Sequence, residues 1–159
     1  MKYRDLLANW GPEKLKLSLG FLDVEFKAED ADRDAAWDLY VELLTRITTQ
    51  HLSPAHGDEK TALDSIYALF GITRTILKSN GPGCVQFSKI AIVVLNQIIR
   101  PFTEKWHKNS LAGDFKNADK CLEFRAELKE LQTDLRKYTA ILAKIADVED
   151  LTDIEGDDN

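Results

Sequence analysis

Residues 121–145 read CLEFRAELKELQTDLRKYTAILAKI, and this stretch decides the fold. Its apolar positions are spaced alternately three and four residues apart; they are Cys121, Phe124, Leu128, Leu131, Leu135, Tyr138, Leu142 and Ile145. Heptad spacing of this kind places all of these side chains on one face of a helix. It is typical of helices that pack side by side at crossing angles of about 20°. The stretch therefore predicts a long helix packed along others, either in the same chain or in a second copy.

Three more amphipathic helices are predicted upstream, and they supply packing partners within the chain. The first begins near residues 30–32 and ends before Ser53, because the residue before a proline avoids helical backbone. The second runs from about 58 to 79 and stops at the NGPG sequence of residues 80–83. The third runs from about 85 to 108, with a kink expected at Pro101. The positions expected to face inward are Trp37, Tyr40, Val41, Leu44, Ile47 and Thr48 in the first helix, Leu63, Ile66, Tyr67, Phe70, Thr73 and Leu77 in the second, and Phe87, Ile90, Ala91, Val94, Leu95, Ile98, Phe102 and Trp106 in the third.

These patterns predict an all-α fold, an up-down four-helix bundle spanning residues 29–146. Residues 14–19 and 21–26 alternate apolar with polar side chains, with a change of phase at Gly20, which favours extended backbone. An isolated extended ribbon is only marginally stable, so we expect residues 1–28 to pack on the body.

Residues 147–159 form an acidic tail that we expect to be flexible. Seven acids and no base lie in it, whereas the other 146 residues carry 20 acids and 21 bases. The body is therefore neither an acidic mimic nor a strongly basic nucleic-acid binder. Val148, Leu151 and Ile154 are spaced three apart among the acids, so the tail is either a solvated terminus or a segment that orders on a partner.

Composition also bounds the setting. No apolar run approaches the roughly 20 residues that span a bilayer, and the N-terminus has no apolar signal core, so neither a membrane nor secretion is expected. The two cysteines, Cys84 and Cys121, lie far apart in the sequence and are typical of reduced thiols. We expect a cytoplasmic protein.

One enzyme class has a recognisable signature here. Arg46 and His51, with four residues between them, and Arg100 and His107, with six, resemble the catalytic Arg–His motif of HEPN ribonucleases, which are also helical bundles. The resemblance implies a histidine acting as general acid or base and an arginine stabilising charge on the scissile phosphate. The alternative is that these are ordinary polar positions near helix ends.

Metal and cofactor chemistry is not expected. Glu104 and His107 have the Glu-x-x-His spacing of di-iron bundles, but such a site needs a second pair and none exists in the sequence. The three histidines and two cysteines lack zinc-ligand spacing.

A local basic and aromatic cluster offers a second binding hypothesis. Arg100, Lys105 and Trp106 could contact nucleic acid through phosphate and stacking interactions. The same residues could instead contact a protein, and Phe102 and Trp106, four apart on one helix face, could simply belong to the core.

Two segments, YVELLTRITTQ at 40–50 and VLNQIIRPFTEKWH at 94–107, resemble a family of small bacterial helical proteins with Y-V-E-L-x-T-R-x-T-T-Q and V-L-N-x-x-x-R-P-F-x-x-K-W-H segments. The likeness covers about residues 21–146 and implies a bacterial cytoplasmic setting but no activity. Its polar positions are expected to form either a shared surface or a buried network that fixes helix register. They are Arg46, Thr48, Thr49, Gln50, Asn96, Arg100, Lys105 and His107.

Taken together, the sequence favours a non-catalytic interaction module, an accessory or regulatory subunit of a larger bacterial system such as antiphage defence. Another protein is the expected partner, and a homodimer is an alternative. The candidate contact residues are Leu151, Ile154, Arg100, Lys105 and Trp106. A HEPN-like ribonuclease and a nucleic-acid-binding bundle are the competing hypotheses.

Overall fold

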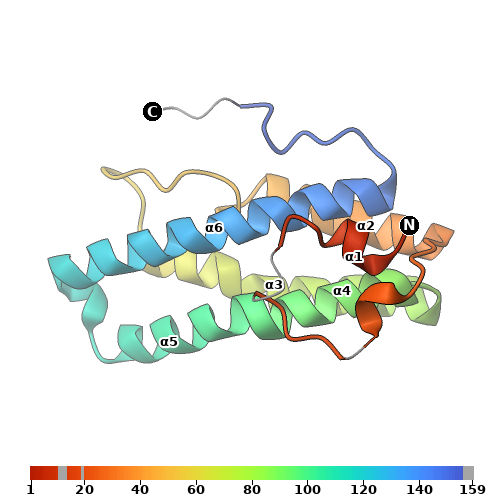
Figure 1. Ribbon diagram of the computed structural model, residues 1–159. Helices are drawn as coiled ribbons and strands as arrows, with labels where there is room; N and C mark the ends of the chain where they lie inside the picture. The colour runs from red at the N-terminus through yellow and green to blue at the C-terminus, as the bar shows by residue number, and fades with distance from the viewer. Residues whose placement is uncertain (11–13, 19, 156–159) are drawn as a thin grey trace.

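The computed structural model describes residues 1–10, 14–18 and 20–155. Its helices are α1 (Tyr3–Leu6), α2 (Asp30–Leu44), α3 (Glu59–Asn80), α4 (Val85–Val94), α5 (Arg100–Leu111) and α6 (Ala118–Ala146), joined by short helical turns η1 (Phe21–Asp23), η2 (Gly81–Gly83), η3 (Leu95–Ile99) and η4 (Asp114–Lys116). The predicted all-α class is confirmed, since the described residues form no strand. Figure 1 shows the axes of α2, α3 and α6 lying roughly parallel to the axis of the end-to-end pair α4 and α5.

Helix α6 is the element that the sequence predicted best. Asn117 caps its first turn by accepting hydrogen bonds from the backbone amides of Asp119 and Lys120. From Phe124 to Ile145, every position of the heptad row is buried. The row therefore faces the core, where α6 packs mainly against α2.

Helix α2 ends earlier than predicted. It stops at Leu44 because three threonine side chains take carbonyls that a longer helix would use. The Thr45 hydroxyl donates to the carbonyl of Val41 at 2.8 Å, while those of Thr48 and Thr49 both donate to that of Leu43, at 2.5 and 2.7 Å. Residues 45–58 consequently form a long non-helical segment between α2 and α3.

The predicted inward face of α2 was wrong at two of its six positions, and the other four are buried or pack against the core. Trp37 and Val41 are 47% and 39% exposed, whereas Tyr40 is buried as expected. The buried row runs through Asp32, Ala36, Leu39 and Leu43, with spacing 4, 3, 4. The small side chain of Ala36 allows neighbouring helices to pack closely. Asp32 is charged, so the row is not visible as an apolar pattern in the sequence.

Helix α3 follows its prediction more closely. Asp58 caps it by accepting from the backbone amide of Thr61 at 2.8 Å, and the chain leaves the helix at Gly81, whose φ is 70°. Of the predicted inward positions, only Tyr67 lies on the outside.

The predicted kink at Pro101 takes the form of a π-helical turn. Helices α4 and α5 are joined through η3 without leaving helical backbone, and the amide of Arg100 bonds to the carbonyl of Leu95, five residues back. A proline has no amide hydrogen and its ring clashes with the carbonyl four residues earlier. The wider turn accommodates both defects, so the helix continues through Pro101.

The described residues that follow α1, up to the start of α2, lie against α4 and η3 without forming a strand. The side chain of Gln97 pairs with the backbone of Lys16, accepting from its amide at 2.6 Å and donating to its carbonyl at 2.7 Å. An isolated bridge joins Lys2 to Glu25. The expectation of extended backbone fails at 21–23, which form a helical turn after Gly20 at φ 85°; Leu19 lies outside the described residues.

A search of the described helices for one long and apolar enough to cross a bilayer finds none.

A buried carboxylate links the starts of two helices. Asp32, fully buried, accepts from the amide of Glu29 at 2.9 Å, which caps α2, and from the amide of Phe87 at 2.8 Å, which lies in the first turn of α4. Nearby, burial and then the charge of Asp32 raise the pKa of Tyr3 to about 12. The carboxylate of Asp32 therefore lies at the N-termini of both α2 and α4, where the helix dipoles favour a negative charge.

Replacing Asp32 tests this link. We expect Asp32→Ala to lower the free energy of unfolding by about 2–4 kcal/mol, because two buried amides lose their acceptor. The matched control is Asp34→Ala, an exposed acid two residues along the same helix, which should change stability by less than about 0.5 kcal/mol. Urea denaturation measures both; equal effects of the two variants would refute the role given to Asp32.

Candidate functional site

Three polar side chains on one face of α6 hold the segment between α2 and α3. The Arg125 guanidinium donates to the carbonyls of residues 52, 53 and 57 at 2.8–3.3 Å and pairs with Glu59 at 2.9 Å. Gln132 donates to the carbonyls of residues 47 and 50 at 2.7 and 2.8 Å, and Arg136 donates to that of residue 49 at 2.8 Å. Six carbonyls that no helix or strand satisfies thus find donors on α6.

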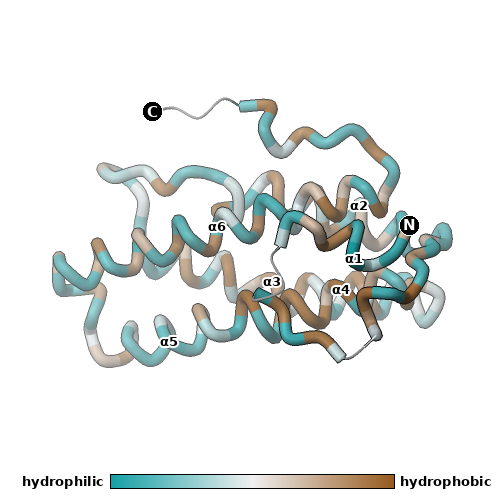
Figure 2. Tube along the Cα trace, in the orientation of Figure 1, coloured by the Kyte–Doolittle hydropathy of each residue, from teal (hydrophilic) through white to brown (hydrophobic). Residues whose placement is uncertain are grey.

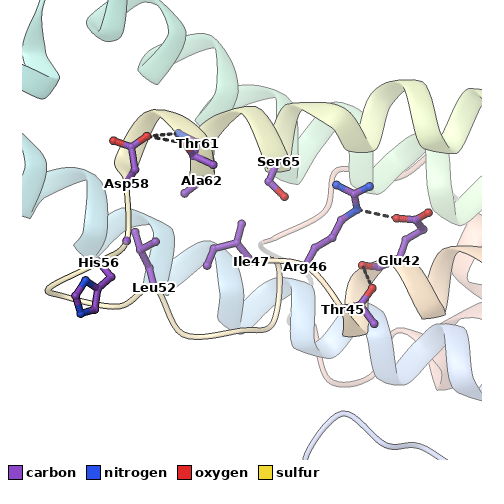
Figure 3. A pocket seen from close by; sticks show the side chains of 11 residues that line it. Glu42, Thr45, Arg46, Ile47, Leu52, His56, Asp58, Thr61, Ala62 and Ser65 are labelled. Carbon is purple, nitrogen blue, oxygen red and sulfur yellow. Dashed lines mark hydrogen bonds and ion pairs between the residues drawn. The ribbon is translucent and has the colours of Figure 1, made fainter.

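The held segment forms one wall of an open groove of about 680 Å³ between the end of α2 and the start of α3 (Figure 3). Arg46 lies at one end, with its guanidinium bonded to Glu42 at 2.7 Å. His56 lies at the other end, and Figure 3 shows Ile47 and Leu52 between the two. The groove therefore brings an arginine and a histidine to one surface feature without directing both at one point.

The first predicted catalytic pair is not assembled in this groove. His51 is exposed and is not among the residues that line it, whereas Arg46 lines it and is engaged by Glu42. A nuclease site needs the base and the cation at the same phosphate.

The members of the second pair contact different neighbours. The Arg100 guanidinium lies 4.7 Å from the centre of the Phe70 ring and donates a hydrogen bond to the side-chain oxygen of Asn96 in η3, one turn earlier. His107 packs edge-on against Tyr67, 4.7 Å between ring centres. The ribonuclease hypothesis stays a prediction that this geometry does not favour.

The predicted basic and aromatic contact residues are largely used inside the protein. Trp106 is fully buried, and its indole nitrogen donates to Glu127 at 2.8 Å, so its ring belongs to the core and offers no stacking face. Lys105 pairs with Glu127 and with Glu123, and these hydrogen bonds raise its pKa. Of this cluster, only Arg100 remains exposed without an acidic partner among the described residues.

The polar positions that the family resemblance grouped form two separate sets. Among the described residues, no hydrogen bond joins the set at 46–50 to the set at 96–107. The first set instead ends α2 and contacts α6.

The described part of the acidic tail, residues 147–155, folds back over α6 and α2 (Figure 1). Asp147 adopts left-handed backbone with φ 56° and reverses the chain. The hydroxyl of Tyr40 donates to the carbonyl of Glu149 at 3.3 Å and accepts from the amide of Leu151 at 2.7 Å. Farther along, Asp153 lies 3.8 Å from Arg136.

Exposed apolar side chains gather where the tail meets α2. On the tail, Val148, Leu151 and Ile154 are exposed, the last at 74%. On α2, Trp37 lies 5.8 Å from the Tyr40 ring, and Val41 is one turn farther along the same face. Figure 2 shows brown, hydrophobic stretches alternating with hydrophilic ones along the segment that follows α6. We use the name tail-docking face for Tyr40 and Arg136, which contact the tail, together with the exposed Trp37 and Val41 of α2.

Sequence reasoning named Leu151 and Ile154 but missed the face beneath them. The apolar spacing of α2 places Trp37 and Val41 in the core, and Arg136 belongs to none of the sequence patterns. The available signal was the competing row through Ala36, Leu39 and Leu43, which turns Trp37 outward.

No group of histidine, cysteine and acidic residues in the described parts of the chain could hold a metal ion. Cys84 is buried, and burial raises the pKa of Cys121, which disfavours its thiolate.

No protein-family model, curated protein or solved structure gives a significant match to this chain. Its function has to be argued from its own residues.

The carbonyl-binding role of Arg125 can be tested directly. We expect Arg125→Ala to lower the free energy of unfolding by about 2–4 kcal/mol, because the carbonyls of residues 52 and 57 and the carboxylate of Glu59 lose their partner, while the carbonyl of Ser53 keeps only the Gly57 amide. Lys129→Ala, at an exposed position one turn along α6, is the control and should cost less than about 0.5 kcal/mol. Thermal denaturation compares the two, and a neutral Arg125→Ala would contradict the assignment.

Proposed function

We propose that this protein is a non-catalytic interaction module that binds another protein through the tail-docking face. One observation carries the proposal: the Tyr40 hydroxyl holds the backbone of a separate, non-helical segment by both a donated and an accepted hydrogen bond. Satisfying the backbone groups of an added segment is a recurring way in which domains recognise peptides.

The body is proposed to be an up-down four-helix bundle, with α4, η3 and α5 counted as one bent helix. Such a bundle can present a binding face on the outside of its helices without an active-site cavity. An accessory or regulatory subunit of a bacterial system, antiphage defence included, is the role we attach to it.

The residues beside Tyr40 suit a protein partner. Trp37 and Val41 expose apolar surface on one helix face, and tryptophan is among the residues that contribute most to protein interfaces. Exposed apolar residues that lie close together are a stronger sign of an interface than single ones.

Charge argues against nucleic acid at the same face. The tail carries seven acids, and its described part lies across α2 and α6. Carboxylates repel phosphates, and nucleic-acid binding depends on basic side chains that neutralise them.

The test is affinity capture of the tagged full-length protein from its host at moderate salt, with quantitative mass spectrometry. The double variant Trp37→Ser with Val41→Ser should lose a stoichiometric protein partner by at least about tenfold, as expected for central interface residues. The control is Leu122→Ser, which removes an apolar residue that is 67% exposed on α6 and should retain the partner.

Equal capture by both variants would contradict the proposed face. Recovery of RNA in place of protein, with loss on nuclease treatment, would contradict the proposed class of partner. Unchanged melting temperatures of the variants establish that the comparison concerns binding, since all three positions lie on the surface.

A further inference from the structure

We infer that the tail-docking face is a binding site for an extended acidic segment of the partner protein, and that residues 148–155 occupy it in cis until that segment displaces them. This inference rests on the proposed function and names the chemistry that the partner must present.

The docked tail defines the footprint. Tyr40 hydrogen-bonds only to backbone groups of the tail, which are the carbonyl of Glu149 and the amide of Leu151. Arg136 lies near a carboxylate two residues farther on, that of Asp153. Any non-helical segment can supply the first two groups, provided that the second position is not proline. The third group makes the site selective for an acid.

Arg136 is positioned in advance for this task. Its guanidinium donates to the carbonyl of Thr49 at 2.8 Å, which fixes one of its nitrogens, while another faces Asp153. Because the side chain is already held by the segment between α2 and α3, binding a carboxylate immobilises little additional side chain.

The tail is loosely held for an intramolecular element. Asp153 is 88% exposed and its distance to Arg136 is long, so water screens this ion pair. Val148, Leu151 and Ile154 leave much of their apolar surface in solvent.

The docked tail also leaves part of the face uncovered. Trp37 and Val41 stay 47% and 39% exposed beside Tyr40 with the tail in place. A partner segment that adds a larger apolar side chain at this point would cover both residues, which the tail does not. Such a segment can displace the tail even though the tail has the advantage of being tethered.

The experiment uses the full-length chain and a fluorescent peptide with the sequence DVEDLTDIE, residues 147–155. Leu151→Pro removes the amide hydrogen that Tyr40 accepts and should release the tail in cis. Leu151→Ala removes the side chain but keeps the amide, and is the matched control. Fluorescence anisotropy should show the peptide binding Leu151→Pro about tenfold more tightly than either the wild type or Leu151→Ala, since tail occupancy lowers the fraction of competent sites.

Two further measurements test the recognition chemistry. Adding Tyr40→Phe to Leu151→Pro should weaken peptide binding at least about fivefold while leaving the aromatic ring in the core. A peptide with asparagine in place of the residue corresponding to Asp153 should bind more weakly to Leu151→Pro, and raised salt should reduce the difference.

Peptide binding that is absent from Leu151→Pro, or unchanged by Tyr40→Phe, overturns the inference. If sedimentation shows that the wild type forms a dimer by exchanging tails at the same concentrations, the occupant is a second copy and the inference is likewise overturned. The two proposals can fail separately. If capture of the partner depends on Trp37 but no peptide binds, only the inference about the acidic segment fails. If the peptide binds but capture of the partner does not depend on Trp37, the proposed function fails.

Discussion

The hydrogen bonds from Arg125, Gln132 and Arg136 of α6 to the segment after α2 are the contacts on which the rest of the surface depends. The threonines at the end of α2 stop the helix at Leu44, so the chain must cross to α3 without regular backbone bonding. Buried or half-buried carbonyls without donors would make that crossing costly. The three side chains, spaced seven and four residues apart, lie on one face of α6 and bond to six of these carbonyls. They thereby fix both the groove and the start of α3.

Arg136 extends the same arrangement to the tail. One side of its guanidinium bonds to the segment after α2, and the other faces Asp153. A rigid platform and a weakly held tail therefore meet at one residue. This division suits an interaction module, because a partner can replace the tail without disturbing the bonds that hold the body.

The sequence predicted the elements whose buried rows are mostly apolar, and it failed where polar groups decide the structure. The heptad row of α6 and the inward face of α3 needed only spacing. The sequence does not show which face of α2 is buried, because Asp32 belongs to the buried row. Its carboxylate binds two helix N-termini that are far apart in the sequence. The end of α2 was missed because threonine hydroxyls compete for carbonyls in a way that the downstream proline does not reveal. Of the candidate site, Leu151 and Ile154 were found from their spacing, whereas Tyr40 and Arg136 act through contacts with residues about 110 and 17 positions away, which no local pattern encodes.

Two hydrogen bonds of the Tyr40 hydroxyl dock the tail, and amide hydrogen exchange at Leu151 measures whether they hold it. Exchange should be measured by NMR on the full-length wild type and on Tyr40→Phe, which keeps the ring and removes only the hydroxyl. The Leu151 amide should exchange about tenfold more slowly in the wild type, the modest protection expected of a replaceable segment, while the amides of α6 should be unaffected. Equal exchange at Leu151 in the two proteins would mean that the hydroxyl does not hold the tail.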